Sequence, residues 1–158
     1  MLALALTSLL WGHSGAARAA TTCSWAGTPT APSGWFTLDP GLTNTPSAAP
    51  SRFVAWGDLA GADPRCRGQM KWIGQADAGS TCSFVSFEGE VKGLVGVARF
   101  WGKGSLLVPS YLYDKAGNLV GVENAEILTP HNLPLATTCL EPTGFTGPAD
   151  FSSTVVLF

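Results

Sequence analysis

The fold is decided by residues 82–128, which read CSFVSFEGEVKGLVGVARFWGKGSLLVPSYLYDKAGNLVGVENAEIL. In residues 84–91, FVSFEGEV, one set of alternate positions is mostly polar and the other apolar or glycine. A period of two places these sets on opposite faces of a strand. Residues 114–118, DKAGN, offer a glycine for the positive φ that hairpin turns require. The segment therefore predicts four consecutive β-strands joined by glycine-bearing turns.

Working outward, similar short patterns predict strands at residues 34–38, 51–61, 66–76 and 152–158, the last of them closing a sheet. No stretch shows the i, i+3, i+4, i+7 apolar spacing of an amphipathic helix over three turns. We therefore expect an all-β protein: a single-domain antiparallel β-sandwich or flattened barrel of about eight strands with two disulfides.

The N-terminal part of the chain has the features of an export signal. Its apolar run, Leu2–Leu10, is shorter than the roughly 20 residues that span a bilayer. The tripeptide at 17–19, Ala-Arg-Ala, has the small-x-small pattern that signal peptidases cleave. We expect residues 1–19 to be a signal peptide cleaved near Ala19 or Ala20, with no integral membrane segment after cleavage. Residues 20–50, rich in Pro, Thr and Ala, are expected to pack on the domain as an N-terminal arm, and residues 51–158 to form the sandwich core.

The chain has four cysteines, all downstream of the expected cleavage site. An even number of cysteines in an exported chain predicts disulfides and a secreted, extracellular or cell-envelope location. Of the three possible pairings, we expect Cys66–Cys82, across a local hairpin, and Cys23–Cys139, which would tie the two ends of the domain together.

The charge pattern bears on the class of partner. Charged residues make up 13% of the chain, its formal net charge is −2, and no basic cluster is larger than Arg65, Arg67 and Lys71. Binding to nucleic acid through phosphate neutralisation is therefore disfavoured. No glycine-rich loop precedes a helix start, so no nucleotide or other cofactor is expected.

Few residues could carry catalysis. The expected mature chain has a single histidine, His131, and no GxSxG elbow accompanies it. Glu88 and Glu90 lie on one face of a strand with backbones about 6.6 Å apart, between the carboxylate separations of retaining and inverting glycosidases. Such catalytic pairs usually come from different strands, however. Glu123 and Glu126 would fall on opposite faces of their strand.

No metal site is expected either. A histidine-rich zinc site is impossible with a single histidine. Loop oxygens of Asp58 with Asp63, or of Asp114 with Asn118, could face a calcium ion, but neither pair has the density of carboxylates that calcium sites show.

Aromatic residues give the remaining indication of function. Trp101, Tyr111 and Tyr113 are candidates for an exposed binding surface, because coplanar aromatic rings can stack on a carbohydrate or hold a protein ligand. We therefore expect a secreted, non-enzymatic binding or extracellular structural module with an unknown carbohydrate or protein ligand. Two alternatives stay open: a small glycosidase-like hydrolase that uses paired carboxylates, and a protease inhibitor that presents the loop 129–138 beside Cys139.

Overall fold

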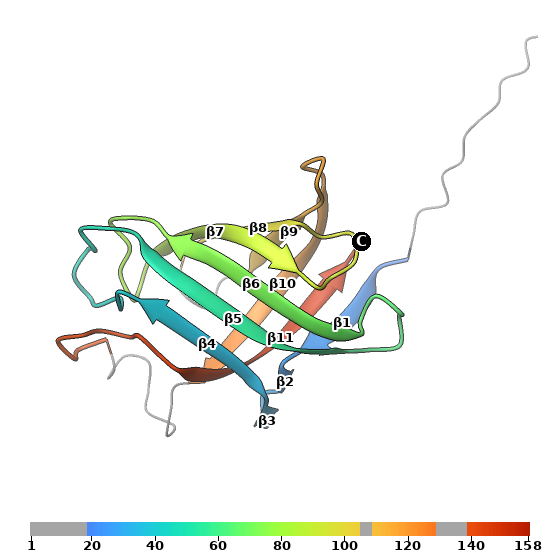
Figure 1. Ribbon diagram of the computed structural model, residues 1–158, viewed down its shortest axis with the longest axis horizontal. Coiled ribbons are helices and arrows are strands. Elements are labelled where there is room, and N and C mark those ends of the chain that lie inside the picture. Colours follow the sequence, from blue (N-terminus) through green and yellow to red (C-terminus); the bar gives the residue numbers. More distant parts are fainter. Residues whose placement is uncertain (1–18, 105–108, 129–138) are drawn as a thin grey trace, which may run out of the picture.

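The computed structural model describes residues 19–104, 109–128 and 139–158, and the expected signal peptide at 1–18 lies outside these ranges. The described chain is all-β, as predicted, and the alternative that it adopts is the barrel: nine antiparallel strands form one sheet that closes on itself (Figure 1). Within the described ranges, no helix is long and apolar enough to cross a membrane. The strands are β1 (Thr21–Trp25), β2 (Gly27–Thr28), β3 (Ala31–Pro32), β4 (Gly34–Asp39), β5 (Ser51–Ala60), β6 (Gly68–Ala76), β7 (Val85–Lys92), β8 (Arg99–Gly104), β9 (Ser110–Tyr113), β10 (Leu119–Leu128) and β11 (Ala149–Leu157).

Strands β5 to β11 follow one another around the barrel, each paired with the next. In β5 buried positions alternate with exposed or half-buried ones, because one face of each strand lines the barrel and the other faces solvent. The four strands predicted in residues 82–128 are β7 to β10, and the predicted hairpin at 114–118 joins β9 to β10, with Gly117 at a φ of 88°. In Figure 1, β10 and β11 pass behind β5 and β6, so that two sides of the barrel enclose a common interior.

Two short strands close the barrel in one shared position. Both β1 and β4 pair with β5 on one side and with β11 on the other, and between them the chain leaves the wall as the small hairpin β2–β3. The wall therefore has eight positions around it, seven filled by β5 to β11 and one shared by β1 and β4. Residues 20–50 supply part of the barrel wall, so the expected arm lying on a separate core is wrong.

The interior is filled mainly by aromatic rings. Trp72 stacks on Phe100 with ring centroids 4.1 Å apart, and Trp25 meets Phe151 edge to face at 4.7 Å. At the end of the barrel where β4 ends, Phe145 is buried and its backbone pairs with that of Leu42. Loops 40–50 and 139–148 therefore contribute side chains that cover this end of the core.

The two disulfides join different cysteines from those predicted. Cys23 is bonded to Cys66, with Cα atoms 5.2 Å apart, and Cys82 to Cys139, with Cα atoms 6.1 Å apart. The expected pairs Cys66–Cys82 and Cys23–Cys139 are therefore wrong. Cys66 and Cys82 cannot be bonded to each other, because Cys66 precedes β6 and Cys82 follows it. The nine residues of β6 hold the two ends about 30 Å apart at ~3.3 Å per residue, whereas a disulfide needs Cα atoms within about 7 Å.

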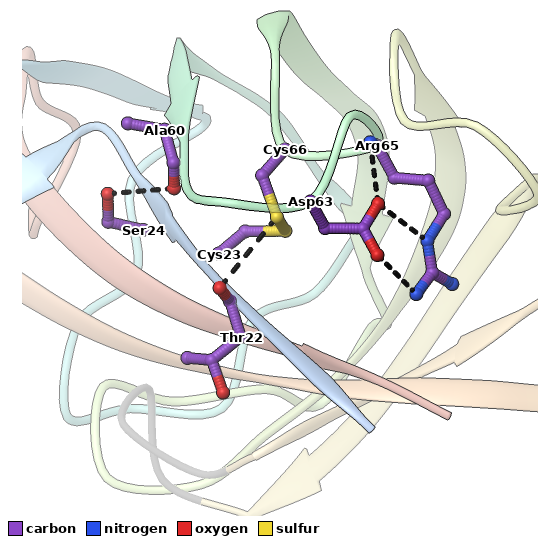
Figure 2. Close-up of a disulfide and its surroundings, with 7 residues drawn as sticks. All are labelled: Thr22, Cys23, Ser24, Ala60, Asp63, Arg65 and Cys66. Carbon is purple, nitrogen blue, oxygen red and sulfur yellow. Dashed lines mark hydrogen bonds and ion pairs between the residues drawn. A yellow bond between two sulfur atoms is a disulfide. The ribbon is translucent and has the colours of Figure 1, made fainter. Parts of the chain in front are cut away.

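Each disulfide therefore fastens one end of the barrel. Figure 2 shows Cys23 of β1 bonded to Cys66 in the β5–β6 loop. In the same loop the Asp63 carboxylate accepts hydrogen bonds from the backbone N, Nε and Nη2 of Arg65, at 2.8–3.2 Å. The second disulfide joins the β6–β7 loop to the segment before β11, at the opposite end.

Candidate interior site

A cavity of about 60 Å³ lies inside the barrel. A single water needs roughly 10–15 Å³ measured in this way, so the space admits several waters or a compact group of a few heavy atoms. Among the described residues the wall is almost wholly apolar, and of these only Ser110 and Glu123 bring polar side chains other than indole groups to it. The lining residues are Trp25, Phe36, Leu38, Leu42, Phe53, Ala55, Trp72, Ala76, Val85, Phe87, Ser110, Glu123 and Phe151.

Glu123 of β10 is the unusual member of this wall, because its side chain is 1% exposed in a largely apolar interior. Burial disfavours the charged carboxylate and raises the pKa of Glu123 from 4.5 to about 7, although hydrogen bonds from the Ser153 and Ser110 hydroxyls act in the opposite direction. The side chain therefore holds a proton up to nearly neutral pH.

The hydrogen-bond geometry accommodates the neutral acid. The Ser153 hydroxyl lies within hydrogen-bond distance of Glu123 Oε1 and 3.0 Å from the backbone oxygen of Asn124. A hydroxyl has one proton to donate, and a carbonyl oxygen can only accept. When Ser153 donates to Asn124, its lone pair is available to accept the carboxylic proton of Glu123, and every group in this cluster is then partnered.

One of the described tryptophans on the cavity wall has a buried indole N–H without a partner. Two tryptophans line the cavity, and Trp25 donates its Nε1–H to the carbonyls of Gly57 and Met70, at 3.1 and 3.2 Å. Trp72 Nε1 is buried and has no hydrogen-bond partner among the described residues. A buried donor without a partner costs about 1–3 kcal/mol and calls for an explanation. An acceptor on a bound molecule would supply that partner.

The residues predicted for binding lie on the outside of the barrel instead. Trp101 of β8 and Tyr111 of β9 are cross-strand neighbours, 39% and 40% exposed, with stacked rings 6.1 Å apart. Tyr113 does not share that ring pair, but it lines an outer depression of about 560 Å³ together with Trp101 and the predicted carboxylate pair, Glu88 and Glu90. The aromatic and acidic candidates therefore come together on one face, separate from the interior cavity.

The other candidates do not converge on either place. Asp58 is exposed on the outer side of β5, and Asp63 bonds Arg65. Asp114 accepts two hydrogen bonds from Asn118 within the β9–β10 turn, which lower the pKa of that carboxyl, so turn formation accounts for this pair. In the part of the chain that the structure describes, no group of three His, Cys, Asp or Glu residues could hold a metal.

Three further sequence predictions cannot be compared with the structure. His131 and the loop 129–138 of the proposed inhibitor lie outside the described residues, as does the side chain of Glu126.

Sequence reasoning considered Glu123 only as half of a carboxylate pair and missed its place in the interior. The local pattern is misleading, because Val120 and Val122 alternate with Gly121 and Glu123, and the valines are the apolar set. The structure nevertheless places Gly121 and Glu123 on the buried face. The one indication in the sequence was Gly121, because a glycine within a strand often marks a close approach of another backbone. The structure shows that approach: a Cβ at position 121 would lie 2.5 Å from the Val156 carbonyl oxygen.

No protein-family model matches the sequence, and no significant match was found among curated proteins or solved structures. Function must therefore be inferred from the chemistry of the site, since a barrel by itself supports many activities.

Proposed function

We propose that this protein is an exported, non-enzymatic binding protein whose barrel interior takes a compact, mostly apolar molecule that carries one hydroxyl or amide group. The observation that carries the proposal is Glu123, a buried carboxyl with a raised pKa on the wall of an apolar cavity. Apolar pockets with a few placed polar groups are the usual form of small-molecule sites, and barrels with eight positions are wide enough to hold one small ligand.

The polar groups on the wall favour this class of ligand. The neutral carboxyl of Glu123, whose proton is donated to Ser153, offers the ligand an acceptor, and the Trp72 indole offers a donor. A hydroxyl or a primary amide can both accept and donate, so it matches both residues, whereas a carboxylate ligand would place a second acid beside Glu123. The cavity of about 60 Å³ limits the inserted group to a few heavy atoms.

Export is part of the proposal. Two disulfides indicate an oxidising compartment, because such bonds are rare in the cytosol. The predicted signal peptide at 1–19 is consistent with passage to the cell exterior or envelope.

Nuclear magnetic resonance of the indole N–H groups tests the interior site. We expect 1-propanol or propanamide, added at millimolar concentration to the oxidised protein, to shift the Nε1–H resonance of Trp72 downfield as it gains an acceptor. The resonance of Trp25 should move little, because that indole already donates to two carbonyls. The two tryptophans are thus an internal comparison.

Filling the cavity provides the matched variant. Ala55→Leu adds bulk at the lining, so we expect it to abolish the Trp72 shift, at a packing cost of about 1–3 kcal/mol. Ala60→Leu makes the same change at an exposed position and should keep the shift. The proposal is contradicted if neither 1-propanol nor propanamide shifts the Trp72 resonance. It is also contradicted if that resonance shifts in the Ala55→Leu variant as much as in the wild type.

A further inference from the structure

We propose that the outer face of strands β6 to β9 is a second binding site, for a neutral saccharide. The site is the depression of about 560 Å³ that Glu88, Glu90, Arg99 and Trp101 line together with Gly74 and Gly89. It lies on the opposite side of the barrel wall from the interior cavity, so this inference does not depend on the interior ligand.

The register of the strands places complementary groups side by side. Glu88 is directly opposite Trp101, and Glu90 is directly opposite Arg99. Arg99 in turn faces Tyr113 on the next strand. Neighbouring strands lie about 4.8 Å apart, and alternate residues on one strand about 6.6 Å apart. The aromatic and ionised groups therefore occupy an area close to that of one or two pyranose rings.

Trp101 supplies a flat apolar surface to the depression. Its ring is held against Tyr111, 23° from parallel, which limits the orientations that it can adopt. The C–H face of a pyranose with equatorial hydroxyls is apolar and flat, whereas its edge bears hydroxyls. Such a ring can pack its apolar face on an indole while the hydroxyls on its edge make hydrogen bonds.

The ionised groups in the depression suit the hydroxyl edge. Glu88 and Glu90 can accept from hydroxyls, and Arg99 can donate to them through its planar fork. The charges nearly balance, because Arg99 faces Glu90, which is also 3.7 Å from Lys92. A strongly charged ligand would find no net complementary field, whereas a neutral ligand with several hydroxyls meets both donors and acceptors.

The floor of the depression is backbone that cannot accept side chains. Gly74 and Gly89 are opposite each other, and a Cβ on either glycine would lie 2.7 Å from the Phe100 ring and within 2.3 Å of a carbonyl oxygen. Phe100 thus packs from inside directly against these two glycines. A floor fixed in this way loses little conformational entropy when a ligand binds.

Isothermal titration with three oligosaccharides of equatorially linked pyranoses tests the site: cellotetraose, chitotetraose and β-1,4-mannotetraose. We expect at least one to bind the oxidised protein with a Kd below about 1 mM. Trp101→Ala should weaken that binding at least tenfold, and Glu88→Gln severalfold. Trp56→Ala is the matched control, because Trp56 is also an exposed tryptophan, 41% accessible, on the outer face of β5, and it should bind as the wild type does.

Each outcome decides the inference. The site is wrong if none of the three sugars binds, or if Trp56→Ala weakens binding as much as Trp101→Ala. Circular dichroism of each variant establishes that the barrel is intact. If shorter sugars are released during the titration and Glu88→Gln abolishes their release, the site is that of a hydrolase, and the proposal of a binding site is overturned.

Discussion

Glu123→Gln should stabilise the protein at pH 8 by about 3 kcal/mol and leave its stability at pH 4 nearly unchanged. The pKa of Glu123 rises from 4.5 to about 7 in the folded barrel because burial penalises the charge. A difference of this size corresponds to roughly 3 kcal/mol at ~1.4 kcal/mol per pKa unit. Glutamine is neutral at every pH and keeps an N–H that can donate to Ser153, so it never incurs this cost.

The direction of the pH dependence follows from the two protonation states. Below pH 4.5 the acid is neutral in both the folded and the unfolded chain. Between 4.5 and about 7 the unfolded chain loses its proton while the folded chain keeps it, so stability falls as pH rises; above about 7 the loss is complete. Folded and unfolded forms can be compared by urea denaturation of both proteins from pH 4 to 8.

The stability difference between variant and wild type isolates this one carboxyl, because every other titrating group is shared. Val95→Ala, an exposed substitution that leaves every titrating group in place, is the control, and its stability relative to wild type should not vary with pH. A Glu123→Gln variant whose stability relative to wild type is the same at pH 4 and pH 8 would contradict a buried, protonated Glu123.

Removing either disulfide should lower the free energy of unfolding by about 4 kcal/mol in the chain-entropy account. The closed segments span 43 and 57 residues, and the cost grows only with the logarithm of their length. Replacing both cysteines of a pair, Cys23 with Cys66 or Cys82 with Cys139, avoids leaving a free thiol. For a chain of this size each double variant should melt more than about 10 °C below the wild type.

Peptide mapping without reduction tests the pairing itself. Trypsin cuts after Arg65 and Arg67, so Cys66 is released in a dipeptide. We expect that dipeptide to be linked to the peptide that ends at Arg52 and carries Cys23. A dipeptide linked instead to the peptide that contains Cys82 would restore the local hairpin pairing and contradict the structure.

Much of the fold could be predicted because local patterns determine it. Alternation in residues 84–91 predicted β7, and the glycine of the 114–118 turn predicted the hairpin between β9 and β10. The closure of the barrel could not be predicted in this way. It depends on β1 and β4 sharing one position between β5 and β11, a long-range arrangement that no local pattern encodes.

The disulfides and the interior site were missed for a related reason. Closeness in sequence favoured Cys66–Cys82, but β6 carries these residues to opposite ends of the barrel. Glu123 was considered only as half of a carboxylate pair with Glu126, and only the pairing of β10 with β9 and β11 turns it toward Ser110 and Ser153. The outer aromatic residues could be predicted as candidates, because Trp101 and Tyr111 lie on strands whose faces are set by alternation.

The interior site makes binding depend on pH. A mostly apolar ligand that fills the cavity should bind more tightly below pH 7 than above it, because excluding water beside Glu123 further penalises the charged form of its carboxyl. By linkage, such a ligand should raise the pKa of Glu123 further when it binds.

The most direct test of the account is a carbon-13 magnetic resonance titration of the Glu123 side-chain carboxyl in the wild-type protein, with and without 1-propanol. We expect a midpoint near pH 7 that moves upward when the alcohol is present. A midpoint near 4.5 that the alcohol leaves unchanged would mean that Glu123 is hydrated and ionised like a surface residue, and the barrel interior would then hold no anchor for a ligand.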